Sequence, residues 1–238
     1  MTTQIKLGDI AVDVVLKDIK NINLSVSSPM GRVRISAPSR MTIDNIRAFA
    51  ISKLGWIKQQ QQKLQRQERE TPREYLDRES HYVWGRRYLL KVVEDDAEPE
   101  VKLNHSEMIL RVRPGAEHNT KQAIVALWYR EQIKATVPAL IAKLELMMQV
   151  KVARVFVQKM KTRWGSCNPA KRSIRLNTDL AKKPHGCLEY IVVHEMVHLL
   201  ERHHNDRFRA YLDQFMPQWR LCREELKQSP VAHENWEY

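Results

Sequence analysis

The sequence has little glycine and proline, few cysteines and no long hydrophobic run. Its 238 residues include 7 Gly and 10 Pro, too few for a collagen-like chain or a string of flexible linkers. No run approaches the ~18 consecutive apolar residues of a membrane-spanning helix. The first residues lack the apolar core and small-residue cleavage site of a secretory signal. We therefore expect a globular protein with no membrane span and no secretory signal.

The three cysteines, Cys167, Cys187 and Cys222, are odd in number, widely spaced and without a C-x-x-C pair. This pattern does not predict a disulfide framework, and buried free thiols suit a reducing compartment. We expect a cytoplasmic protein.

Acidic residues are much fewer than basic residues. Lys and Arg number 40 against 28 Asp and Glu, a net charge of +12. Such an excess favours contact with an anionic surface, which makes nucleic acid a possible partner. The basic residues are spread along the chain, however, and neither an RNA-binding signature of alternating glycine and aromatic residues nor a zinc-finger spacing is present.

The first part of the chain is rich in strand patterns. Period-two alternation of β-branched residues predicts strands around residues 12–14, 22–26 and 33–35. Thr42 then stands at an N-cap position, and apolar spacing over residues 46–57 predicts a helix. The charged stretch 66–73 indicates a solvated helix end followed by a linker at Thr71–Pro72.

Further strands are predicted around residues 82–84, 88–93 and 108–112. From about Asn119 the pattern is helical, and Pro138 is expected to break or restart that helix. Strands at 154–159 and 173–177 and a helix after Pro184 follow. The shift toward helix near residue 116 predicts a boundary between a strand-rich region with a helix (1–115) and a helical region with a small sheet (116–238), hence an α+β fold.

The last of these helices contains His194-Glu195-Met196-Val197-His198, the pattern H-E-x-x-H. Residues four apart face the same way on a helix, so both imidazoles can reach one Zn²⁺. Glu195 is offset from the metal and suits a general base that takes the proton of the metal-bound water. The alternative is a pair of satisfied polar histidines on a helix face.

A catalytic zinc needs a third protein ligand and one open position. Glu201, His203 and His204 are the nearby candidates. A straight helix would rotate both histidines away from the metal, so the chain must turn first. Spacing alone does not choose among the three.

Four blocks of sequence together resemble the YgjP-like metallopeptidase family and, more distantly, the WLM and SprT-like zinc peptidases. They are Met160–Cys167, Ile174–Asn177, Tyr190–Leu199 and His204–Phe208. The resemblance covers residues ~120–238 and implies a zincin-like domain with an H-E-x-x-H-x5-H site. It implies that His194, His198 and His204 bind zinc and that Glu195 is the catalytic base. His203 stands where the family usually has Asn, and Arg209 where an aromatic residue often follows Phe208.

Four residues outside this set have two interpretations each. Trp164 and Gly165 either line the cleft or form core packing beside a tight turn. Asn177 either binds substrate backbone or caps a turn, and the cap is favoured. Asp206 either orients a ligand histidine or caps a helix. The strand 173–177 is a hypothetical free edge for an extended peptide.

The predicted function is zinc-dependent hydrolysis of peptide or amide bonds, with a peptide or protein as substrate. One alternative is a basic adaptor associated with nucleic acid, in which proteolysis is secondary or absent. Another is a protein that zinc merely stabilises. An acid beside the first ligand argues against the latter, because a structural zinc needs no general base.

Overall fold

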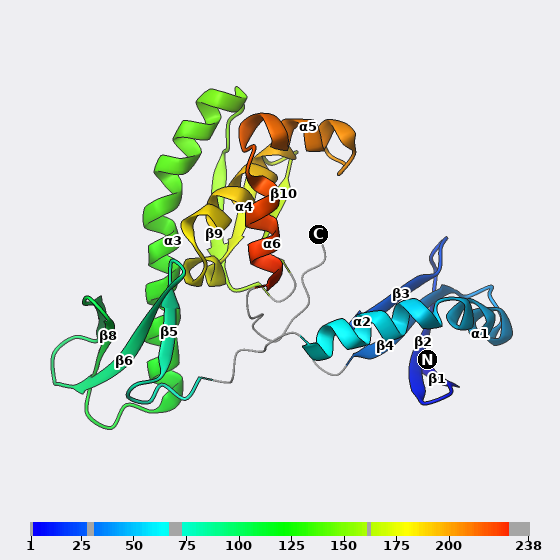
Figure 1. Ribbon diagram of the computed structural model, residues 1–238, viewed down its shortest axis with the longest axis horizontal. Helices are drawn as coiled ribbons and strands as arrows, with labels where there is room; N and C mark the ends of the chain where they lie inside the picture. The colour runs from blue at the N-terminus through cyan, green and yellow to red at the C-terminus, as the bar shows by residue number, and fades with distance from the viewer. Residues whose placement is uncertain (1, 28–30, 67–72, 161–162, 229–238) are drawn as a thin grey trace. The chain divides into compact units, whose positions relative to one another are not determined.

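The computed structural model describes residues 2–27, 31–66, 73–160 and 163–228 (Figure 1). The chain divides into two compact units, with the division between residues 70 and 71. Both units contain helices and sheet, so the predicted α+β class is confirmed.

The first unit is a four-stranded sheet with two helices. Its elements are β1 (Thr2–Leu7), β2 (Ile10–Lys17), β3 (Asn23–Ser27), β4 (Arg32–Pro38), α1 (Ile43–Ser52) and α2 (Leu54–Arg66). The strand order is β1-β2-β4-β3, with β2 and β4 parallel. Thr42 is the expected N-cap and accepts a hydrogen bond from the Asn45 N–H at 3.4 Å. The predicted single helix is divided at Lys53, and the expected linker at Thr71–Pro72 lies outside the described residues.

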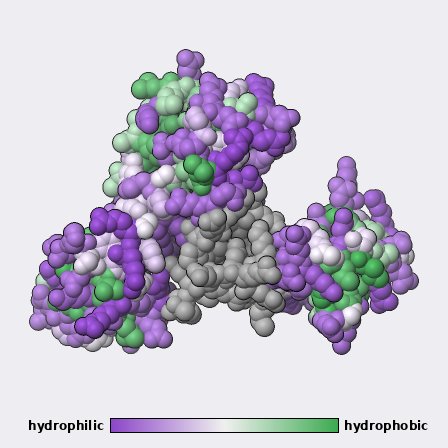
Figure 2. Space-filling model, in the orientation of Figure 1, coloured by the Kyte–Doolittle hydropathy of each residue, from purple (hydrophilic) through white to green (hydrophobic). Residues whose placement is uncertain are grey.

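The apolar residues of the period-two strand pattern form the inward face of this sheet. Val12, Val33 and Ile35 are fully buried, as are Ile46 and Ile57 of the two helices. Alternate residues of a strand point to the same face, so the period-two pattern delivers these side chains to one small core. The visible surface of the unit is mixed, with hydrophobic patches among hydrophilic residues (Figure 2).

The second unit begins with a sheet of four strands in the order β5-β6-β8-β7. Its strands are β5 (Ser80–Val83), β6 (Arg86–Glu94), β7 (Glu100–Leu103) and β8 (Glu107–Val112). The sequence predicted three of these strands, β5, β6 and β8. It did not predict β7, nor β1 in the first unit.

Helix α3 (His118–Met148) runs unbroken through Pro138, so the expectation of a break there was wrong. Pro138 is exposed, whereas its neighbours Val137 and Ile141 are buried. The buried stripe along the helix continues on both sides of the proline, and this packing offsets the loss of one backbone hydrogen bond.

A second sheet supports the remaining helices. It has the order β10-β11-β9, formed by β9 (Arg154–Gln158), β10 (Gly165–Asn168) and β11 (Ser173–Asn177). A short 3₁₀ helix, η1 (Thr178–Lys182), leads into α4 (His185–Val197), and α5 (Asp206–Phe215) and α6 (Trp219–Gln228) follow. Strands β9 and β11 are parallel, and β10 pairs with β11 through an antiparallel hairpin.

The division of the chain differs from the expected one at 115/116. That position lies inside the second unit, between β8 and α3. The reason is packing: Met108 and Leu110 of β8 share one hydrophobic core with Val125 and Ile133 of α3 and with the helices beyond. Among the described residues, no helix has the length and apolar composition needed to cross a membrane.

Candidate metal centre

Helix α4 carries the H-E-x-x-H pattern and is held firmly at its start. The two-residue turn between β5 and β6 consists of Trp84 and Gly85, both with positive φ (49° and 79°). The backbone N–H of Trp84 donates to the Ala181 carbonyl at 2.8 Å, and its ring stacks on His185 with centroids 4.1 Å apart. A Cβ on Gly85 would lie 2.8 Å from Cγ of Pro184, the N-cap of α4. The hairpin tip therefore packs directly against the first residues of the helix.

Helix α4 is apolar on nearly all sides, as a helix in the middle of a core must be. Every residue from Cys187 to Val197 except Glu189 is buried. The polar side chains of His194 and Glu195 are thus held inside the unit, at 4% and 2% exposure.

The structure brings His194, His198 and His204 together. One ring nitrogen from each lies within 4.8 Å of the other two, and the Nε2 atoms of His194 and His204 are 3.0 Å apart. The three histidines differ in exposure: His194 is buried, His198 is half-buried and His204 is exposed. One side of the group is therefore open to solvent.

The chain turns between His198 and His204, as a third histidine ligand requires. Helix α4 ends at Val197, with His198 as its C-cap, and α5 starts only at Asp206. His198 Nδ1 lies 3.2 Å from the Glu201 carbonyl oxygen. If it donates there, Nε2 of His198 is left as an acceptor, the arrangement typical of a metal-ligating imidazole.

The two other candidates for the third metal ligand, Glu201 and His203, are not part of the three-histidine group. The Glu201 carboxylate accepts a hydrogen bond from the His203 backbone N–H at 3.1 Å, which closes the turn. His203 itself is exposed and is not a member of the three-histidine group.

Phe208 of α5 is the packing partner of all three histidines. Its ring centroid lies 5.0, 4.8 and 4.7 Å from those of His194, His198 and His204. The N-terminus of α5 is fixed by Asn205, whose side chain accepts from the Phe208 N–H at 3.0 Å. Sequence analysis placed Phe208 within a motif but gave no reason for it; its apolar ring confines the imidazoles to their shared orientation.

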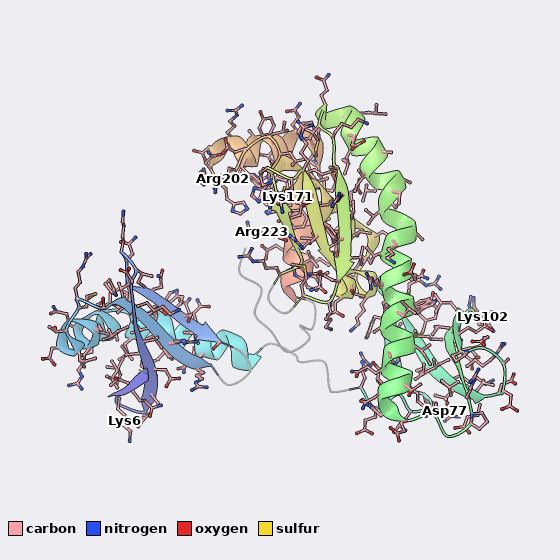
Figure 3. The ribbon with its side chains drawn as sticks, turned by 180° about the vertical axis from the view of Figure 1, so that it is seen from behind. Lys6, Asp77, Lys102, Lys171, Arg202 and Arg223 are labelled. Atoms are coloured by element: carbon pink, nitrogen blue, oxygen red, sulfur yellow. The ribbon has the colours of Figure 1, made fainter. Side chains whose placement is uncertain are left out.

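The histidines are held in their neutral form. Burial, followed by the charges of His198 and His204, lowers the pKa of His194 to about 3. Burial also lowers the pKa of His198 and His204. Arg223 of α6, labelled in Figure 3, adds to the lowering for His194 and His204. Three neutral imidazoles directed at one point fit a transition-metal ion such as Zn²⁺, which binds neutral imidazole nitrogen.

Glu195 lies on the same helix and against strand β10. A Cβ on Gly165 would lie 2.7 Å from Oε1 of Glu195 and 2.9 Å from Cγ2 of Ile191. Only glycine lets β10 approach α4 this closely. Burial raises the pKa of Glu195 to about 8, against a smaller lowering by the charge of Arg163. Sequence analysis did not single out Arg163, which has no distinctive spacing.

The remaining residues with two interpretations have structural roles. Trp164 is buried in the core. The Asn177 side chain caps η1 by accepting from the Asp179 N–H at 3.1 Å, and it donates to the Met160 and Arg163 carbonyls at 2.9 Å. Asp206 is exposed and pairs with Arg209.

The free edge expected at residues 173–177 was misplaced. Strand β11 is the central strand of its sheet, between β10 and β9, and both its edges are paired. The edge strand beside α4 is β10. No strand was predicted at residues 165–168, where Gly165 and Asn168 are poor strand formers.

Comparisons with known proteins bear on this site. A search of curated proteins finds no match. Two solved structures share low similarity with the chain. They are the metallopeptidase zymogens abylysin of Pyrococcus abyssi (16% identity, 40% of this chain, 100% of that chain, TM-score 0.36) and jannalysin of Methanocaldococcus jannaschii (17%, 38%, 92%, 0.35). We draw no argument from a likeness at this level. The family model described as YgjP-like, metallopeptidase domain matches residues 20–229, and the chain therefore belongs to the YgjP-like metallopeptidase family.

Proposed function

We propose that this metallopeptidase is a zinc enzyme that hydrolyses peptide or amide bonds, with zinc held by His194, His198 and His204 and with Glu195 as general base. The observation that carries the proposal is the convergence of three imidazole nitrogens, from α4, its C-cap and the turn that follows, within 4.8 Å of one another, next to the buried carboxyl of Glu195. All four residues lie within the region 116–238, which we propose as the catalytic part of the chain.

Bound at the three histidines, zinc would polarise a scissile carbonyl and lower the pKa of its water to ~7. The chain's own contribution is proton transfer and positioning. Glu195 would take the proton of the attacking water and deliver it to the leaving amine. A positive charge held beside Glu195 would lower its pKa from about 8 toward neutrality, where a carboxylate can both accept and release a proton.

Substrate binding is proposed along β10. It is an edge strand, and its first residue, Gly165, faces Glu195. An extended peptide that pairs with this strand would gain backbone hydrogen bonds whatever its sequence. Its scissile bond would then pass close to Glu195.

The test uses the Glu195→Gln variant at matched zinc content. General acid–base groups typically contribute ~10²–10⁴ in rate, so the variant should keep at most about 1% of peptide-cleaving activity while binding zinc normally. Glu189→Gln is the matched control, because Glu189 lies on the same helix but on its half-buried side, near Lys143. It should keep full activity.

The same experiment separates an enzyme from a protein that zinc only stabilises. A structural zinc would be closed by a fourth protein ligand, and its loss would unfold the chain. Undiminished turnover in Glu195→Gln would overturn the role of Glu195. If the wild-type protein cleaves no member of a broad peptide library, the proposed peptidase function is wrong.

A further inference from the structure

A second concave site lies in the same unit as the metal centre but is formed by other elements. Its volume is about 580 Å³, within the range of ~300–1,000 Å³ usual for small-molecule sites. The walls come from the first half of α3, from β5, and from the residues at the carboxyl ends of the parallel strands β9 and β11. None of the three clustered histidines, nor Glu195, lines it.

Two of the lining residues are lysines that meet at one acidic residue. Lys159 and Lys182 share one carboxylate, with Nζ–Oδ distances to Asp179 of 2.7 and 3.0 Å. Asp179 is buried and ionised, since the two lysine charges hold its pKa below its ordinary value in spite of burial. Asp179 thus contributes one negative charge to the pocket and the two lysines contribute two positive charges.

Two arginines add to this excess at the rim. Arg130 is exposed on α3, and Arg73 pairs with Glu79 at 3.4 Å. Among the described residues that line the pocket, four are basic and one, Asp179, is acidic. A cavity with low-dielectric walls concentrates such a field on whatever enters it.

The remaining walls are apolar or aromatic. The Tyr129 ring is buried at the base of the pocket, and Lys182 Nζ lies 5.7 Å from its centroid. The Tyr129 hydroxyl donates to the Tyr82 carbonyl at 2.8 Å, which joins α3 to β5 across the pocket. Ala123 and Ala126 of α3 also line the pocket and contribute only small apolar side chains.

We propose that this pocket binds a small organic anion with a planar apolar body, its phosphate or carboxylate group held by Lys159, Lys182 and Arg130. Burial of the flat body against Tyr82, Tyr129 and the alanines supplies affinity that inorganic anions lack. The charged group meets ammonium and guanidinium donors, which form the stronger hydrogen bonds. The site is separate from the peptidase centre, so it does not depend on the function proposed above.

The test is calorimetric titration of the full chain with 1-naphthyl phosphate, 1-naphthoate, inorganic phosphate and 1-naphthol. The two aromatic anions should bind with one site per chain, and comparison between them identifies the preferred anionic group. Inorganic phosphate and neutral 1-naphthol should each bind at least about tenfold more weakly, the equivalent of about 1.4 kcal/mol. Equal binding of 1-naphthol and 1-naphthyl phosphate would overturn the proposal.

Two variants locate the binding. Ala126→Trp fills the pocket without changing charge and should abolish binding of the aromatic anions, whereas Ala135→Trp, at an exposed position of the same helix outside the pocket, should not affect it. Arg130→Gln should weaken binding about tenfold, whereas Lys134→Gln, one turn away and paired with Glu131, should not. Circular dichroism checks folding of each variant. Unchanged affinity in Ala126→Trp and Arg130→Gln would place the ligand elsewhere and refute the site.

Discussion

Glu195 makes the stability of the metal-free protein depend on pH in a way that can be calculated. Burial raises its pKa from 4.5 to about 8, so the folded protein holds a proton that the unfolded chain has lost. Between these two values the folded state binds more protons, and stability therefore falls as pH rises. The Glu195→Gln variant cannot ionise and lacks this dependence.

The size of the effect follows from the shift. Each pH unit within the window removes about 1.4 kcal/mol from the free energy of unfolding, and the whole shift corresponds to a few kcal/mol. His194 acts in the opposite direction, because its pKa is lowered to about 3. It stabilises the folded state above its unfolded pKa of ~6.5 and loses this contribution only as pH falls below that value. Between pH 6.5 and 7.5 the contribution of His194 is small and is shared by Glu195→Gln, so the difference between the two proteins isolates Glu195.

The assay is urea unfolding with a chelator present, followed by tryptophan fluorescence. Trp84, Trp128, Trp164 and Trp219 lie in the same unit as Glu195, and Trp56 lies in the first unit, so most of the signal reports the unfolding of the unit that contains Glu195. Between pH 6.5 and 7.5 the wild-type protein should lose about 1 kcal/mol relative to Glu195→Gln. His118, whose pKa is raised by its bond to the Arg73 carbonyl, titrates in both proteins, and its contribution cancels in the difference.

Saturation with zinc provides an internal check. A positive charge at the three histidines would lower the pKa of Glu195, so the difference in slope between the two proteins should shrink. Parallel stability profiles for metal-free wild type and Glu195→Gln between pH 6.5 and 7.5 would refute the reasoning. That result would mean that Glu195 is already ionised in the folded protein.

Three further predictions concern the packing around the site. His204→Ala should reduce zinc content, measured by elemental analysis, far more than His203→Ala, because His203 is outside the three-histidine group; the reverse ranking would assign the ligand to His203. Gly165→Ala should lower peptide-cleaving activity at least about tenfold, since the new methyl group would lie 2.7 Å from Oε1 of Glu195 and small misplacements of catalytic groups are costly. Gly55→Ala, where nothing lies within 4 Å, is its control, and equal activity in both variants would contradict the packing argument. Phe208→Ala should cost about 3–5 kcal/mol in urea unfolding and weaken zinc binding, and a change below about 1 kcal/mol would show that the ring does not hold the histidines.

The sequence by itself determined helix α4, which carries His194 and Glu195. The spacing of His194 and His198 and the apolar run before them predict a buried helix with two imidazoles on one face, because helical periodicity is a local property. The alternation at residues 12–14 and 33–35 predicted strands for the same reason. Local patterns also placed Thr42 as a helix cap, and the structure has it there.

Only the tertiary structure decided which elements meet. Pro138 lies inside a continuous helix because the buried stripe on either side packs against the core, which local propensity does not include. Strand β10 pairs with β11 in a hairpin and packs closely against α4 at Gly165 and Glu195, and the second of these contacts joins residues far apart in the sequence. Spacing left open which of Glu201, His203 and His204 lies beside the two earlier histidines for the same reason: a turn and packing against Phe208 bring His204 back to His194.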